Sequence, residues 1–191
     1  MKVYKFGGTS VGTVERMKHV AELISESAPK IVVLSATAGT TNHLEEIAAN
    51  LFSRDIEQAH EKITRLEFQF IDFANELLTD ESIKREAIDY ILDRFQRLWQ
   101  FINDEFTSVE EKEVLAQGEL ISTALLHFYL RERKIANILL SAFDFMRTGT
   151  EGEPDLKYIE EKLQAQLAQY PGINLLLLST SAKTLIMKRI I

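Results

Sequence analysis

The stretch KVYKFGGTSV, residues 2–11, decides the fold of this 191-residue chain. Its first five residues alternate as a short strand does, and Gly7 and Gly8 then end the strand. After them we expect a helix over about residues 11–27, because its apolar residues keep to one face and Thr9 or Ser10 can cap its first turn. The chain therefore opens with a strand, a glycine turn and a helix.

A second strand is expected at residues 31–34, a continuous and mainly β-branched run that is typical of a parallel strand buried on both faces. Small, loop-forming residues fill positions 35–41, and Asn42 is expected to open a helix that ends at Leu51. Strand, helix, strand and helix in this order predict an α/β fold, a three-layer α/β/α domain with a mainly parallel open sheet.

The middle of the chain has neither glycine nor proline between residues 56 and 106. Apolar residues recur there at helical spacing on both sides of Thr79 and Asp80, either of which can cap the second helix. We therefore predict a helical hairpin inserted after the second strand, over about residues 54–108. Its phenylalanines and Trp99 are expected to pack in the core, whereas His60 and the acidic residues lack metal-ligand spacing and are expected to face solvent.

Beyond the hairpin the α/β pattern returns, with no internal repeat and no low-complexity linker. We expect a helix over residues 114–133, a buried strand over 135–140, a loop over 147–155, a helix over 156–169 and a strand over 173–178.

The charge and composition of the chain exclude several kinds of partner. Acidic residues outnumber basic ones by 29 to 22, which disfavours nucleic acid and anionic membranes as partners. No apolar run approaches the roughly 20 residues that a membrane helix needs. The chain contains no cysteine, so it forms no disulfide and no thiolate metal site. These features indicate a cytoplasmic protein.

The glycine turn after the first strand has the chemistry of a phosphate site. Gly7 and Gly8 lack a Cβ, so the backbone can pass close to a ligand, and Lys5 adds a positive charge. The following N–H groups and a helix N-terminus would attract an anion. The turn lacks the spacing of a Walker A loop or a dinucleotide fingerprint, and strand-Gly-Gly-helix segments are common. Alone, this turn does not establish the site.

The loop after the second strand carries hydroxyl groups and a glycine, from Ser35 to Asn42. Because ligands of open α/β sheets bind beyond the carboxyl ends of the strands, this loop and the glycine turn are expected to face one crevice. An ordinary turn with a threonine or asparagine helix cap would have the same composition.

Three segments in this order resemble the amino-acid kinase family, and within it the aspartate kinases. They are KFGGTSV at 5–11, LSATAGTTN at 34–42 and LAQGELISTALLHFYLRER at 115–133, which contains Gly118, Glu119 and Ser122. Phe143-Asp144 and Arg147-Thr148 fit the stretch that follows. The resemblance covers roughly residues 1–172 and implies that residues 1–191 are part of an amino-acid kinase domain.

The resemblance also implies a reaction, transfer of the γ-phosphate of ATP to the β-carboxylate of L-aspartate, the first step of the lysine, threonine and methionine pathway. Lys5 would be the catalytic group, because its ammonium would offset the negative charge of the γ-phosphoryl group as it moves to the acceptor. Thr41 and Glu119 would bind aspartate, with Glu119 pairing with its α-ammonium, although a glutamate in an amphipathic helix ordinarily faces solvent. Mg²⁺ would come with ATP, held by phosphates and water rather than by a protein metal site. The residues that would line the ATP phosphates are Lys5, Phe6, Gly7, Gly8 and Ser35.

The family pattern continues with a second glycine-rich loop that is missing here, since all eight glycines lie at or before Gly172. We therefore expect the ATP-binding C-terminal half and the regulatory domains to be absent. A shifted reading frame after about Leu175, or a gene truncated by one, would account for the tail. Losing the final strands would leave an open sheet edge near residues 173–178 and favour a homo-oligomer.

Three hypotheses for function stay open. The chain is an aspartate kinase, or a catalytically inactive fragment that acts at most as a phosphate-binding or dimerising module, or another amino-acid kinase such as a glutamate or acetylglutamate kinase.

Overall fold

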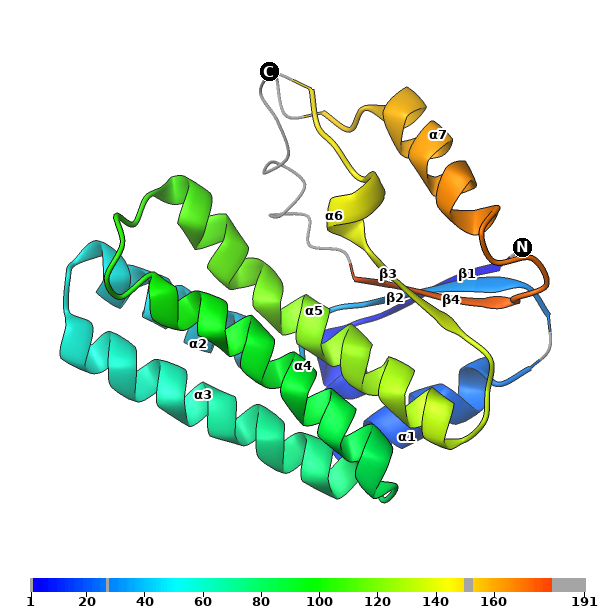
Figure 1. Cartoon of the computed structure of the whole chain (residues 1–191), viewed down its shortest axis with the longest axis horizontal. Helices are drawn as coiled ribbons and strands as arrows, with labels where there is room; N and C mark the ends of the chain where they lie inside the picture. The colour runs from blue at the N-terminus through cyan, green and yellow to red at the C-terminus, as the bar shows by residue number, and fades with distance from the viewer. Residues whose placement is uncertain (1, 27, 150–152, 180–191) are drawn as a thin grey trace.

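The central sheet confirms the predicted α/β class. In the computed structural model, which describes residues 2–26, 28–149 and 153–179, four strands form one sheet in the order β1-β2-β4-β3. All three pairings between these strands are parallel (Figure 1). The strands are β1 (Lys2–Phe6), β2 (Lys30–Leu34), β3 (Ile138–Ser141) and β4 (Leu175–Ser179).

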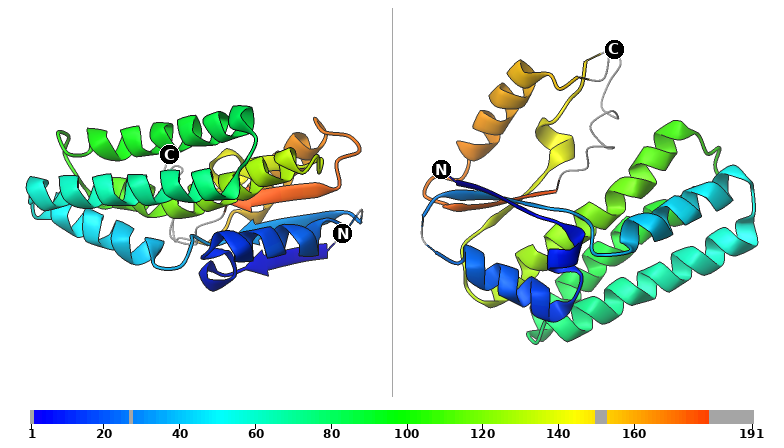
Figure 2. Two further views of the ribbon diagram at one scale, coloured as in Figure 1. Left: turned by 90° about the horizontal axis from the view of Figure 1, so that it is seen from below. Right: turned by 180° about the vertical axis from the view of Figure 1, so that it is seen from behind.

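Helices cover both faces of the sheet (Figure 2). Alternate residues of β4 divide between two cores: Leu175 and Leu177 pack with α1 (Val14–Ile24) and α5 (Ser108–Glu132), and Leu176 and Leu178 pack on the other side. There, α6 (Ala142–Phe145) and α7 (Leu156–Leu167) complete the third layer. The period-2 alternation of a strand thus builds the three-layer architecture.

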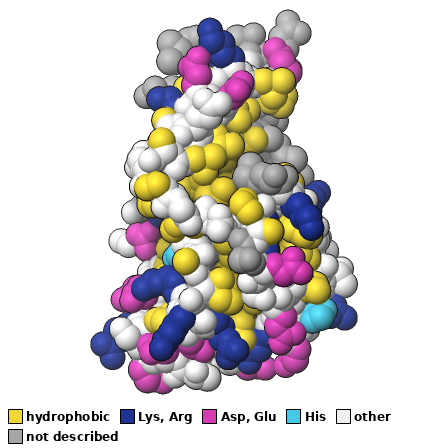
Figure 3. Space-filling view, turned by 90° about the vertical axis from the view of Figure 1, so that its right-hand side faces the viewer, with side chains coloured by type: hydrophobic (Ala, Val, Ile, Leu, Met, Phe, Trp, Pro, Cys, Tyr) yellow, Lys and Arg dark blue, Asp and Glu magenta, His cyan; other side chains and the backbone are white. Residues whose placement is uncertain are grey.

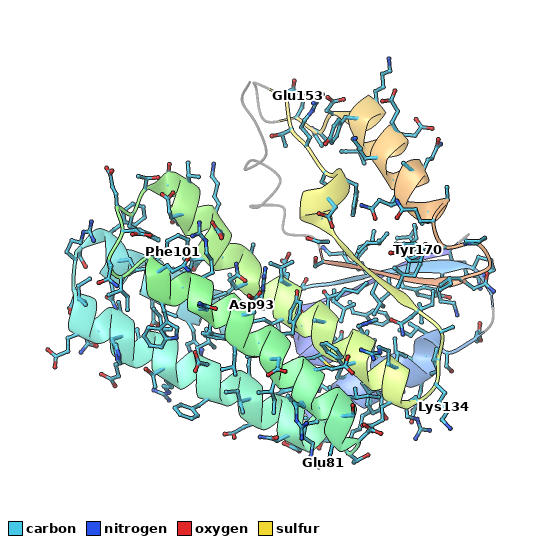
Figure 4. All side chains as sticks on the ribbon, in the orientation of Figure 1. Glu81, Asp93, Phe101, Lys134, Glu153 and Tyr170 are labelled. Carbon is cyan, nitrogen blue, oxygen red and sulfur yellow. The ribbon has the colours of Figure 1, made fainter. Side chains whose placement is uncertain are left out.

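The predicted hairpin is present. After α2 (Thr40–Phe52), the helices α3 (Ile56–Leu77) and α4 (Glu81–Gln100) run antiparallel, with Glu81 and Phe101 marking the two ends of α4 in Figure 4. Asp80 caps α4 as expected, since its Oδ1 accepts hydrogen bonds from the N–H groups of Ser82 and Ile83, both 3.0 Å long.

Most aromatic side chains of the hairpin are in the core, as predicted. Phe70 and Phe95 are buried, and the indole of Trp99 is half-buried and donates a 2.9 Å hydrogen bond to Glu67. Phe68 is an exception, because it points out of α3 and is 59% exposed.

Three helix starts differ from the prediction. After the glycine turn the chain makes a 3₁₀ turn (Gly8–Val11), and α1 begins only at Val14 with Thr13, not Thr9 or Ser10, as its cap. The start of α2 lies at Thr40 rather than Asn42, because Gly39 adopts a φ of 85° and turns the chain. A capping box of Thr107 and Glu110 starts α5 at Ser108, six residues before the expected position.

Two strands begin later than predicted. The strand expected from residue 135 begins at Ile138, because Lys134 adopts a left-handed φ of 57° and the chain is still turning after it. The strand expected from residue 173 begins at Leu175, after the turn at Gly172.

The expectation of an open edge at residues 173–178 is wrong. β4 lies between β2 and β3, and Leu175 to Leu178 are all buried. The crossover through α7 brings β4 into the middle, so the edges of this sheet are β1 and β3. Exposed apolar side chains lie elsewhere, among them Val3 on β1 and Leu156 on α7. Figure 3 shows apolar side chains gathered on the side that lies at the right in Figure 1, between charged groups.

Glu132, near the end of α5, holds the turn of the hairpin. Its Oε2 accepts hydrogen bonds from the N–H groups of Thr79 and Asp80, both 2.8 Å, and its Oε1 accepts one of 3.0 Å from the Thr79 hydroxyl. Partial burial by itself raises the pKa of Glu132, but these hydrogen bonds outweigh it and hold the pKa below its usual range.

We expect Glu132→Ala to lower the free energy of unfolding by about 1–3 kcal/mol at pH 7, because two N–H groups lose a charged acceptor. A carboxylate whose pKa is lowered by folding stabilises the protein above its unfolded pKa, and this contribution is lost as the pH falls through the folded pKa. Urea unfolding at pH 7 and pH 3 measures both effects. Glu76→Ala, an exposed change on α3, is the control; equal losses in the two variants would contradict the assignment.

Candidate active site

The carboxyl ends of all four strands lie along one edge of the sheet, the carboxyl edge, which runs across the strands and is distinct from the edge strands β1 and β3. Their last residues are aligned in register, with Phe6 beside Leu34, Leu34 beside Ser179, and Ser179 beside Ser141. Both loops that the sequence singled out therefore leave the sheet side by side, as expected for a ligand site in an open α/β sheet.

Glycines let three segments approach one another at this edge. A Cβ on Gly8 would lie 2.7 Å from the carbonyl oxygen of Ala36, and a Cβ on Gly118 would lie 2.8 Å from the Ala36 methyl group. A Cβ on Gly12 would likewise lie 2.9 Å from the Cβ of Ala38. The glycine turn, the loop after β2 and α5 thus pack directly on one another, and all three parts of the sequence pattern converge.

Hydroxyl groups stabilise the loop between β2 and α2. The hydroxyls of Thr37 and Thr40 are buried and hydrogen-bonded to each other at 2.6 Å. Thr41, the predicted substrate residue, is exposed in the first turn of α2. The N-terminus of α2 has Gly39 as its cap, with no side-chain hydrogen bond to its free N–H groups and no acidic residue in its first turn. These N–H groups can receive an anionic ligand.

Of the ionisable side chains at the carboxyl edge, Glu119 has the largest pKa shift. It lies on α5, directly after Gly118, and its Oε2 is buried with no hydrogen-bond partner within residues 2–26, 28–149 and 153–179. Burial raises the pKa of Glu119 to about 7, and the positive charge of Lys5 opposes this rise. A half-buried carboxylate with one oxygen that no described residue contacts by a hydrogen bond has the chemistry to bind a ligand cation.

The structure brings most of the sequence-predicted residues together at this edge. Lys5 is exposed at the end of β1, and its charge acts on Glu119 from a strand more than a hundred residues away in sequence. Ser35 follows β2, and its N–H donates a 3.0 Å hydrogen bond to the carbonyl of Phe6. Gly7 is exposed, and a Cβ there would meet nothing within 4 Å. Sequence reasoning missed Ala36 and Thr40, and no pattern in the sequence distinguishes Thr40 from Thr41.

Arg147, after α6, is not free for a ligand. Its guanidinium forms an ion pair with Asp155, with a 3.0 Å hydrogen bond from Nε, and its Cζ lies 4.1 Å from the centre of the Tyr158 ring. Thr148 beside it is buried. Arg147 therefore stabilises the segment that leads to α7.

Comparison with known proteins decides the family. Residues 1–179 match the pattern of the amino acid kinase family. The chain belongs to the amino acid kinase family. Its relatives in this family include the lysine-sensitive aspartokinase 3 of Escherichia coli strain K12, 31% identical over 169 residues, and an aspartokinase of Chlamydia trachomatis, 31% identical over 172 residues. These matches span 86% and 83% of this chain.

Solved structures of amino acid kinases have the same fold. The structure of E. coli aspartokinase III in complex with aspartate and ADP superposes with a TM-score of 0.77 at 27% identity, over 93% of this chain. The match spans only 40% of that chain, and the two curated relatives are matched over 37% and 35% of their length. The described residues contain no helix that is long and apolar enough to cross a membrane.

Proposed function

We propose that this chain carries the amino-terminal part of an aspartokinase site, which transfers the γ-phosphate of ATP to the β-carboxylate of L-aspartate. The observation that carries the proposal is the half-buried carboxyl group of Glu119, whose buried Oε2 has no hydrogen-bond partner among the described residues, together with the nearby charge of Lys5. An amino-acid substrate offers an ammonium group for Glu119, and a nucleotide offers phosphates for Lys5. A relative of known structure, E. coli aspartokinase III, was solved in complex with aspartate and ADP.

The nucleotide side of the site would rest on Lys5 and the backbone of Phe6, Gly7 and Gly8. The exposed Gly7 leaves room for phosphate oxygens next to the chain, and the Lys5 ammonium offsets their charge as the phosphoryl group moves. Ser35 would lie beside the transferring group. Positioning and charge neutralisation contribute most of the rate in phosphoryl transfer, so no strong nucleophile of the protein is needed.

The amino-acid side would rest on Glu119 and Thr41. The β-carboxylate of aspartate is ionised near neutral pH and is itself the nucleophile, so the reaction needs no general base. Mg²⁺ would enter with ATP, held by phosphates and water.

A second candidate is a binding module without turnover. The chain corresponds to less than half of the length of the aspartokinases that it matches. In this case the site would bind its ligands without transferring the phosphoryl group. The tail hypothesis, a changed reading frame, concerns mainly residues 180–191, which lie outside the described residues.

Calorimetry and a coupled ADP-release assay separate the two candidates. The kinase is supported if the chain binds Mg-ATP and aspartate and turns them over, and if Lys5→Ala loses both the binding and the turnover. Binding without turnover would support the module. If the folded chain binds neither ligand, both candidates are rejected. Turnover with glutamate or N-acetylglutamate as acceptor tests the third hypothesis, a glutamate or acetylglutamate kinase. N-acetylglutamate has no ammonium group for Glu119 to bind.

The two glycines of the turn are expected to respond differently to alanine. Gly8→Ala forces a Cβ against the Ala36 carbonyl oxygen, so we expect it to destabilise the fold by about 1–3 kcal/mol. Gly7→Ala has open space and an ordinary φ of −79°, so the fold should keep its stability while Mg-ATP binding weakens. Thermal unfolding and calorimetry of both variants measure this difference. Normal stability of Gly8→Ala would contradict the packing argument.

A further inference from the structure

Ser35 joins the two sides of the site through its backbone. Its N–H donates to the carbonyl of Phe6 at 3.0 Å, and its own carbonyl accepts a 2.9 Å hydrogen bond from the hydroxyl of Ser122. The first bond connects the loop after β2 to the last residue of β1, directly before the glycine turn, and the second connects the loop to α5. One residue thus links all three segments.

Ser122 lies one turn after Glu119 on α5 and is 0% exposed. Its hydroxyl has a single proton, and the bond to Ser35 is shorter than the 3.2 Å distance to the carbonyl of Glu119. The Glu119 carbonyl has another donor, the hydroxyl of Thr123 at 2.7 Å. The hydroxyl of Ser122 therefore serves mainly the contact between the helix and the end of β2.

The contact is built for close approach. Gly118, one turn before Ser122, leaves no space between α5 and Ala36, so the helix reaches the loop closely enough for a direct hydrogen bond. Thr123, next to Ser122 and equally buried, donates its hydroxyl to the carbonyl of Glu119 in the same helix. Of these two adjacent hydroxyls, one crosses to the sheet and the other does not.

We propose that Ser122 is a positioning residue that fixes Glu119 relative to Ser35 and the glycine turn. This inference rests on the proposed function, in which Glu119 binds the ammonium group of the amino acid and the turn binds the phosphates. The donor and the acceptor lie 87 positions apart in the chain. The bond therefore sets the distance between α5, which carries Glu119, and the loop after β2, rather than the conformation of either segment. Without it, α5 slides or tilts against the loop, and Glu119 moves with the helix.

The test compares Ser122→Ala with Thr123→Val in the full chain. Each variant removes one buried hydroxyl from adjacent positions of α5, but only the first removes the bond to Ser35. We expect Ser122→Ala to weaken the binding of aspartate in the presence of Mg-ADP by roughly three- to tenfold, and Thr123→Val to change it by less than about twofold. Equal weakening in both variants, or none in Ser122→Ala, would overturn the proposal.

A second readout does not depend on ligand binding. Carbon-13 NMR follows the titration of the Glu119 carboxyl in the free chain, and we expect its midpoint to move in Ser122→Ala and to stay in Thr123→Val. If wild type binds no ligand but this midpoint moves, the proposed function fails while the positioning role stands. If the midpoint in Ser122→Ala equals that of wild type, the positioning role is rejected, whether or not the chain binds aspartate.

Discussion

Glu119→Gln should make the fold more stable above pH 7 and strongly weaken the binding of aspartate. The pKa of Glu119 rises from its ordinary value of 4.5 to about 7 on folding, because burial disfavours the charged carboxylate. Below pH 4.5 the carboxyl is neutral in both states, and its contribution to stability is fully present. As the pH rises to about 7 the unfolded chain releases the proton first, so stability is lost. Above that pH the folded protein carries a poorly solvated charge.

Glutamine has the same shape as glutamate but no charge, so the stability of the variant does not fall in this way as the pH rises to about 7. We expect it to exceed wild type in the free energy of unfolding by about 1–2 kcal/mol at pH 8, after a discount for solvent screening, and to match it near pH 4.5. Urea unfolding at both pH values measures the difference. Glu111→Gln, which replaces a carboxylate by an amide in the first turn of the same helix, is the control. A variant no more stable than wild type at pH 8 would contradict the burial argument.

The same substitution is expected to weaken aspartate binding by roughly a hundredfold, because a charged acceptor for the ammonium group is lost. Stability and binding then change in opposite directions at one residue. This combination separates a ligand site from a structural charge, whose removal would lower stability.

Gly118→Val should unfold the protein or destabilise it by about 3 kcal/mol or more, because the branched side chain enters a closed contact. A Cβ at this position would lie 2.8 Å from the Cβ of Ala36, 2.9 Å from the Thr40 methyl group and 3.2 Å from the Leu44 side chain. Neither Ala36 nor Thr40 has a long side chain that can move aside. Helix propensity acts in the other direction but is small, about 1 kcal/mol at most.

Lys112→Val is the matched control, since it puts the same residue into α5 at a position that is not buried. Thermal and urea unfolding of the two variants give the comparison, and Gly118→Ala should fall between Gly118→Val and wild type. A Gly118→Val chain that unfolds at the same urea concentration as wild type would show that α5 and the loop do not pack as closely as the structure has them.

Local patterns predicted the order of the elements well and their ends less well. The hairpin and the Asp80 cap were predicted because helical spacing and a capping residue lie within a few consecutive residues. The start of α5 was misplaced, because the apolar count began at Val114 and overlooked the capping box at Thr107. The place of β4 inside the sheet was missed as well, because strand order depends on crossovers and not on the strand's own residues.

The candidate site was predicted in part. Lys5, Ser35 and Glu119 could be named from the three ordered segments, and the structure places them at one edge of the sheet. Buried polar side chains whose partners lie outside their own helix or strand could not be found. Lys30 is an example, only 2% exposed, with its ammonium group donating to the carbonyls of Ile24 and Glu26 at 3.0 and 2.6 Å. It satisfies the end of α1, and its own neighbours in sequence give no sign of this.

The sequence by itself determined the α/β class, the inserted hairpin and the glycine turn of KVYKFGGTSV, because each depends on the spacing and backbone freedom of consecutive residues. Only the tertiary structure decided that Gly8 and Gly118 close on Ala36, that Ser122 binds Ser35, and that Oε2 of Glu119 is buried with no hydrogen-bond partner among the described residues. These features arise when segments far apart in the chain exclude water from one another, and a carboxylate acquires its unusual pKa only in that environment.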